Sequence, residues 1–295
     1  VIAIDGASVQ MHGDFYETLI YTHGDISDKL TELNSCTEFI ELHQGINSFV
    51  EIKSVEPLPG KLIEKISALA VVDYIRTLDP VLPVLSRRNL KVPFITASEM
   101  ELYNNKKNLA LWELAVHYEM MRGNISAEQV FEKMRAIVKI MRNAIAQGLK
   151  GTHWEDRILG AQSLNFRTQM DDGKLVEGDA LNTIILFTSA MMEVKSSMGV
   201  IVAAPTAGSC GALPGAVIGT GTVLGVGEDE LVKAMLAAGM IGVFIAAHAT
   251  FAAEVGGCMA ECGSGSRMAA AGIVLLKNGT LHQSLAAASM SLQTS

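Results

Sequence analysis

A long uncharged stretch constrains this chain more than any other feature. From Met198 to Gly227 the sequence contains no Asp, Glu, Lys or Arg, and much of it is Gly, Ala, Ser, Thr and Pro. A second segment rich in small residues follows at Ala252–Gly272. Because glycine lets a backbone turn tightly and approach its surroundings closely, both segments are expected to surround a small ligand inside an apolar interior.

An apolar run, Leu231–Ala253, joins the two segments and is long enough to span a bilayer. Small residues recur in it at every fourth position, which lets a second helix approach closely along that face. The run has no aromatic belt and no basic flank, and His248 lies within it. We therefore expect a buried central helix of a soluble protein, ending at the second segment. The row of small residues is Ala234, Ala238, Gly242, Ala246 and Thr250, continued by Glu254 and Cys258.

Charge and cysteine content exclude two classes of protein. The net charge of −8, without a run of Lys and Arg, argues against a nucleic-acid-binding surface. Four cysteines in 295 residues are too few and too unevenly spaced for a disulfide scaffold. Reduced thiols in a cytoplasmic protein are expected.

The chain begins without Met and ends in an unfinished helical pattern, so we interpret it as an internal fragment.

Residues 1–98 are expected to form a small α+β segment followed by a connector. Three histidines there match no metal-ligand spacing and are interpreted as surface residues. Prolines mark the connector, which reaches to about Ser98. The histidines are His12, His23 and His43, and the prolines are Pro80, Pro83 and Pro93. The predicted strands are Val1–Ile4, Thr18–Tyr21 and Asn47–Val55, and the predicted helices are Asp28–Leu42 and Leu62–Leu78.

Residues 99–295 are expected to form a mainly α domain. Ser126 and Gln129 have the spacing of a capping box at the start of a helix that reaches about Gln147. Gly151–Gly178 is polar and predicted to be a loop. Its Arg157 or Arg167 could bind a substrate carboxylate, although a solvated loop arginine is the simpler interpretation. The remaining predicted helices are Ala180–Val194, Arg267–Leu276 and Leu281–Leu292.

Two groups of residues suggest chemistry. Thr206, Ser209 and the N–H groups of Ala207 to Gly211 could form a concave site for an anion. Cys258 and Cys262 have the spacing that places two thiols on one face of a helix, where they could hold a soft metal or an iron–sulfur cluster. On spacing alone, buried free cysteines are the simpler interpretation. A Cys–His nucleophile pair using His248 has no local sequence signature.

The two segments resemble a known family. SSMGVIVAAPTAGSCGALPGAV and EVGGCMAECGSGSRMAAAG are similar to the α chain, or α domain, of the iron–sulfur-dependent L-serine dehydratases (L-serine ammonia-lyases). The resemblance extends from about Asn108 to the last residue. The opening VIAIDG and HGDFYETLI resemble the end of the family's β domain. The resemblance implies a helical catalytic domain, a [4Fe–4S] cluster with one iron open to substrate, and a cytoplasmic carbon–nitrogen lyase of amino-acid catabolism and gluconeogenesis.

The resemblance also implies roles for individual residues. Cys258 matches a cluster ligand, Cys262 does not, and the remaining ligands are expected beyond Ser295. The residues expected to bind the substrate carboxylate are Thr206, Ala207, Gly208 and Ser209, and the catalytic base is unassigned. Lys195-Ser196 departs from the Asn-Ala pair of the family.

The expected partner is a small amino acid, and neither a nucleic acid nor a membrane is expected. Whether the chain forms a homo-oligomer is left open. The alternatives are a related cysteine desulfidase-type lyase, or a non-catalytic helical binding or membrane protein.

Overall fold

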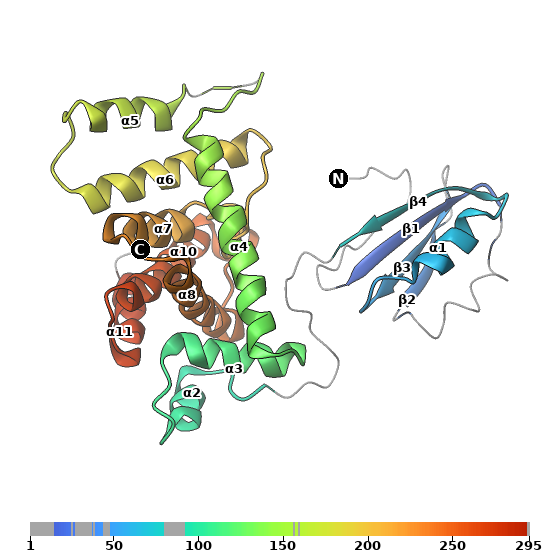
Figure 1. Cartoon of the computed structure of the whole chain (residues 1–295), viewed down its shortest axis with the longest axis horizontal. Helices are drawn as coiled ribbons and strands as arrows, with labels where there is room; N and C mark the ends of the chain where they lie inside the picture. The colour runs from blue at the N-terminus through green and yellow to red at the C-terminus, as the bar shows by residue number, and fades with distance from the viewer. Residues whose placement is uncertain are drawn as a thin grey trace. The chain divides into compact units, whose positions relative to one another are not determined.

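A computed structural model describes residues 15–24, 26, 37, 39–43, 48–79, 92–155, 157–158 and 160–293. The chain divides into two compact units, Val1–Leu90 and Lys91–Ser295. Several predicted features lie outside the described residues: the strand Val1–Ile4, His12, Cys36, Pro80, Pro83 and most of the helix Asp28–Leu42. Figure 1 shows the elements of each unit.

The small unit is an antiparallel sheet with one helix against it (Figure 1). The strands are β1 (Tyr16–Thr22), β2 (Phe39–His43), β3 (Ser48–Ser54) and β4 (Val72–Leu78), in the order β2-β3-β1-β4, and the helix is α1 (Gly60–Ser67). Because successive side chains of a strand alternate between faces, Ile20, Val50 and Ile52 form a core with Ile66 of α1. Leu19, Tyr21 and Phe49 form a separate apolar cluster.

Two helices predicted in this unit are wrong in part. The predicted helix Leu62–Leu78 divides into the end of α1 and strand β4. The sequence VDYIRTL contains β-branched and aromatic residues that favour strands, and pairing with β1 outweighs the helical pattern. Residues 39–42 of the predicted helix Asp28–Leu42 likewise belong to β2, which pairs with β3.

The second unit is helical, as the mainly α prediction for this part of the chain requires. Its helices are α2 (Ala97–Asn104), α3 (Leu111–Gly123), α4 (Ala127–Gly148), α5 (Gln162–Asp171), α6 (Asp179–Ser196), α7 (Ala212–Leu224), α8 (Glu228–His248), α9 (Ala253–Gly256), α10 (Cys258–Leu276) and α11 (Leu281–Gln293). Within this unit α8 packs against α10, α3 and α4, while α7 packs against α6 and α10 (Figure 1). The fold class predicted from sequence is confirmed.

The start of α4 follows the predicted capping box. Ser126 Oγ accepts a hydrogen bond from the Gln129 N–H at 3.2 Å, and Gln129 Oε1 accepts from the Ser126 N–H at 2.9 Å. Two backbone donors that have no partner inside the helix are satisfied in this way. Val130 and Met141 of the predicted apolar face are buried.

The loop predicted over Gly151–Gly178 is wrong in its middle, where α5 forms. The first N–H groups of α5, from Gln162 and Ser163, donate to the carboxylate of Glu193 on α6. A cap supplied from thirty residues away leaves no local pattern in the sequence. This explains why the local composition indicated a loop.

The central apolar helix, α8, is buried over most of its length from Leu231 to Gly242. Its row of small residues accepts α10 closely, because a side chain at Gly272 would meet the Ala234 carbonyl oxygen at 3.0 Å. By length and composition α8 could cross a membrane, but 56% of its apolar window is buried inside the protein, as in the core helix of a soluble protein. The helix ends at His248, earlier than predicted, so Cys258 begins α10 instead of continuing α8.

Candidate active site

The two glycine-rich segments meet where the loop before α7 packs against α10. A side chain at Gly265 of α10 would lie 3.5 Å from the Ala204 carbonyl oxygen and 3.6 Å from Ser209 Cβ. A methyl group at Gly208 would overlap the carboxylate of Glu261, which lies on the first turn of α10. Glycine at these positions lets the loop and the helix approach each other to backbone distance.

The turn from Thr206 to Ser209 is held by its own hydrogen bonds. Ser209 is 2% exposed, and its hydroxyl donates to the Ala204 carbonyl at 3.3 Å and lies 3.2 Å from Thr206 Oγ1. The Ser209 N–H donates to Thr206 Oγ1 at 3.4 Å. Ser209 therefore fixes the shape of the turn, while the half-exposed Thr206 and Gly208 and the exposed Ala207 face outward.

Three backbone donors of this turn remain open. Within the described part of the chain, the N–H groups of Thr206, Ala207 and Gly208 donate to no protein acceptor. Successive unpaired N–H groups in a turn form a concave site for an anion. The geometry is therefore compatible with the anion site predicted from sequence, and the role of these residues in binding substrate stays a prediction.

Glu261 is the residue that sequence reasoning did not assign. Its side chain is half-buried beside Gly208, and none of the ion pairs among the described residues includes it. The site therefore combines a negatively charged carboxylate with backbone N–H donors that carry partial positive charge. An amino-acid zwitterion offers the complementary pair, an ammonium and a carboxylate. The sequence signal was weak, because a glutamate three residues after a cysteine fits many helices.

The three described cysteines occupy different environments. Cys258 follows Gly257, whose φ of 75° requires glycine-like freedom, and both Cys258 and Cys262 are exposed on α10. Cys210 is completely buried, with its Sγ 3.9 Å from Met192 Sδ. Burial raises the pKa of the Cys210 thiol, so this cysteine is suited to packing and not to nucleophilic attack. His248 is exposed at the end of α8.

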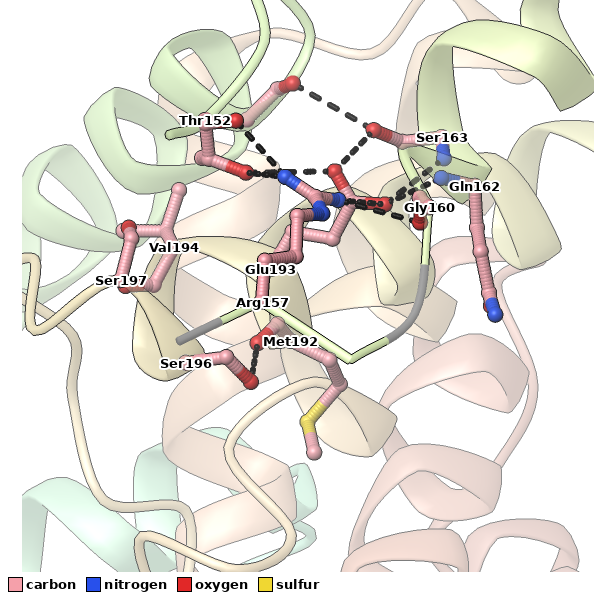
Figure 2. A network of polar contacts seen from close by, with 11 residues as sticks. Thr152, Arg157, Gly160, Gln162, Ser163, Met192, Glu193, Val194, Ser196 and Ser197 are labelled. Atoms are coloured by element: carbon pink, nitrogen blue, oxygen red, sulfur yellow. Dashed lines mark hydrogen bonds and ion pairs between the residues drawn. The ribbon is translucent and has the colours of Figure 1, made fainter. Parts of the chain in front are cut away.

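A buried carboxylate, Glu193, organises the helices beside the site (Figure 2). Its Oε1 accepts from the N–H groups of Gln162 at 2.6 Å and Ser163 at 3.0 Å, and its Oε2 accepts from the Ser163 hydroxyl at 2.8 Å. Arg157 Nη2 lies 3.3 Å from Oε1. Burial alone would raise the pKa of Glu193, but the hydrogen bonds from Ser163 and Gln162 and the charge of Arg157 outweigh it, so the pKa is lowered.

Arg157 is neither a substrate clamp nor a solvated loop arginine in this structure. Besides contacting Glu193, it donates from Nη1 to the Thr152 carbonyl at 2.7 Å, and its guanidinium carbon lies 4.1 Å above the centre of the Trp154 ring (Figure 2 shows the network around Glu193). Arg167 is an exposed residue of α5 paired with Asp171 at 3.5 Å. The solvated interpretation therefore holds for Arg167 alone.

A hollow of about 630 Å³ lies elsewhere in the helical unit. It lies along α4 and at the start of α8, and it shares no residue with either glycine-rich segment. Charged side chains that line it also pair with one another, since Arg135 lies 3.5 Å from Glu228 and 3.2 Å from Glu132. The hollow therefore does not identify a substrate site.

Comparison with known proteins places this geometry in context. The family model described as "Serine dehydratase alpha chain" matches residues 106–295, which include both glycine-rich segments. The "L-serine dehydratase, alpha chain" of Peptoniphilus asaccharolyticus is 31% identical over 198 residues, or 67% of this chain and 68% of the relative. The "Probable L-serine dehydratase, alpha chain" of Bacillus subtilis is 29% identical over 200 residues, covering 68% and 67%. "L-serine dehydratase 1" of Escherichia coli is 27% identical over 210 residues, covering 68% of this chain but 45% of the relative.

Proposed function

Because the chain belongs to the serine dehydratase alpha chain family, we propose that it is the α part of an L-serine ammonia-lyase, which converts L-serine to pyruvate and ammonia. Membership of the family supports a lyase acting on L-serine. The main structural support for placing the active site here is the contact between Gly208 and the Glu261 carboxylate, which joins the two glycine-rich segments. The proposed enzyme acts on a small amino acid in the cytoplasm, where thiols stay reduced.

The reaction removes the α-proton and the β-hydroxyl of serine, and the aminoacrylate so released hydrolyses to pyruvate and ammonia. In this proposal the N–H groups of Thr206, Ala207 and Gly208 bind the substrate carboxylate. Glu261 accepts a hydrogen bond from the α-ammonium group, which fixes the orientation of the α-carbon. Holding a substrate by both charged ends lowers the entropic cost of reaching the reactive geometry.

The family suggests a [4Fe–4S] cluster, and this chain's residues fit part of its ligand set. Such a cluster needs three or four cysteine ligands. Cys258 is exposed at the first position of α10, where it can reach a bulky group, but Cys210 is buried against Met192. We propose Cys258 as one ligand, with the others expected outside the described residues. When bound, the cluster would supply a Lewis acid for the hydroxyl leaving group.

The test is a measurement of pyruvate and ammonia formed from L-serine by an anaerobically purified full-length protein that contains this chain. Iron and sulfide analysis of the same preparation tests the cluster separately. We expect turnover of L-serine and none of D-serine. If the protein releases sulfide from L-cysteine and leaves L-serine unchanged, a cysteine desulfidase is the correct assignment. If it binds iron and turns over neither amino acid, the proposed activity is wrong.

A further inference from the structure

The small unit holds a cluster of metal-ligating side chains apart from the proposed substrate site. Glu41 and His43 on β2 and Glu51 on β3 each place a ligand atom within 4.8 Å of the other two. Glu41 and His43 are two residues apart on one strand, so they project from the same face, and Glu41 lies directly opposite Glu51 in the register. Two neighbouring strands thus bring three ligands together.

The buried member of the cluster is Glu51, which is only 2% exposed. Two carboxylates directly opposite each other across a strand pair, Glu41 and Glu51, repel. Lys53 Nζ forms an ion pair with Glu51 Oε1 at 2.9 Å, and this oxygen accepts no hydrogen bond within the described part of the chain. Glu41 and Glu51 thus place two carboxylates on this face beside the ammonium group of Lys53.

The imidazole of His43 is oriented for a shared ligand. Its ring stacks on Phe49 with centroids 4.5 Å apart and an interplanar angle of 13°. This stacking directs Nε2 to within 2.9 Å of Glu51 Oε2. Two ligand atoms that each lie about 2.1 Å from a tetrahedral zinc ion are themselves about 3.4 Å apart. The hydrogen-bonded Nε2 and Oε2 atoms therefore need to separate by only about 0.5 Å to share one ion.

We propose that Glu41, His43 and Glu51 bind one Zn²⁺ ion, which connects strand β2 to β3. An imidazole nitrogen with two carboxylates suits zinc, whereas Mg²⁺ and Ca²⁺ prefer oxygen ligands throughout. The ion reaches the site from the side of Glu41, which is exposed. The three ligands come from two strands, so their spacing in the sequence matches no local metal-binding motif. For this reason the histidines of this segment were interpreted from sequence as surface residues. This site is independent of the proposed reaction with serine.

The experiment is a Zn²⁺ titration of the full chain against a chromogenic competing chelator, followed by thermal unfolding with and without Zn²⁺. All variants carry Cys258→Ala and Cys262→Ala, which remove the two thiols that are exposed among the described residues. We expect one tight zinc equivalent and a higher Tm when it is bound. Loss of an outer-shell partner already weakens metal sites by about 10–100-fold, so His43→Gln should weaken binding by at least about 100-fold.

The matched control is His23→Gln. His23 is an exposed histidine of the same unit paired at 2.7 Å with a single carboxylate, Asp73, so its removal should leave the zinc equivalent unchanged. Glu41→Gln provides a second test that does not depend on a buried residue, and it should also weaken binding. No zinc equivalent in the parent, equal binding by His43→Gln and the parent, or equally tight binding of Mg²⁺ would each overturn the proposal.

Discussion

The two glycine-rich segments use their small residues for different purposes. The first begins as an irregular loop over residues 199–211, in which three backbone N–H groups donate to no acceptor among the described residues, and continues as helix α7. The second is almost entirely helical, in α9 and α10, and its Gly265 and Gly272 let neighbouring backbones approach. Similar composition therefore produces an open turn before α7 and close-packed helices in α7 and α10. The proposed site is the line along which the two meet.

The largest predicted effect distinguishes the two exposed cysteines of the helical segment. In a full-length enzyme, Cys258→Ala should lose both iron and L-serine deamination, because Cys258 is the proposed cluster ligand. Cys262→Ala should keep both, since its thiol lies one turn further along α10. Iron content and pyruvate formation are measured on the same anaerobic preparations. Full iron and activity in Cys258→Ala would show that the ligand assignment is wrong.

The second prediction tests the loop segment through Gly208→Ala. The added methyl group overlaps the Glu261 carboxylate, which can move because it is the end of a flexible side chain. Stability should change little, whereas kcat/KM for L-serine should fall by about 100-fold, the cost of misplacing a group by about 1 Å. Gly239→Ala is the control, because its methyl group meets nothing within 4 Å. Equal kinetics for the two variants would remove Glu261 from the site.

Sequence reasoning succeeded where local patterns determine structure. The capping box at Ser126 and the small-residue row of α8 each depend on residues within a few turns of one another. The capping box was confirmed, and the row was confirmed from Ala234 to Gly242 but not beyond the end of α8. It failed at α5, whose cap comes from Glu193 on another helix, and at β4, which was predicted as helix and instead pairs with β1. The sequence predicted that the two glycine-rich segments surround one ligand, but the particular contact of Gly208 with Glu261 joins residues far apart in the chain and leaves no local pattern.

The third prediction compares Glu261 of the proposed site with Glu193, a carboxylate that has only a structural role. Glu193 accepts hydrogen bonds from Gln162 and Ser163 and pairs with Arg157, whereas Glu261 has no such set. Hydrogen bonds to charged groups contribute about 1.5–3 kcal/mol each, so Glu193→Gln should lower the free energy of unfolding by roughly 2–3 kcal/mol. Denaturant unfolding measures this value. Glu261→Gln should change stability much less and should instead lower kcat/KM.

The same carboxylate predicts a pH dependence of stability. The folded-state pKa of Glu193 is lowered, so its contribution is fully present above the unfolded pKa of about 4.5 and is lost as the pH falls through the folded value. The free energy of unfolding should therefore decrease below about pH 4.5, and the Glu193→Gln variant should lose less over that range. Parallel pH curves for parent and variant would contradict the proposed network.

The smallest effect is expected at a helix end far from both segments in the sequence. Ser126→Ala removes the side-chain acceptor for the Gln129 N–H, and loss of such a cap costs about 1 kcal/mol. The kinetics with L-serine should remain those of the parent. A change in KM with unchanged stability would indicate that α4 takes part in the site and that the comparison of the two segments is incomplete.

The most direct test of the account is a double-mutant cycle in kcat/KM for L-serine, built from Gly208→Ala and Glu261→Gln. The two residues belong to different segments and touch each other in the structure. If both hold one substrate, the Gly208→Ala variant already displaces Glu261, and the double variant should lose far less than the product of the two single losses. Losses that multiply, or single variants with the kinetics of the parent, would contradict the claim that the two glycine-rich segments form one site.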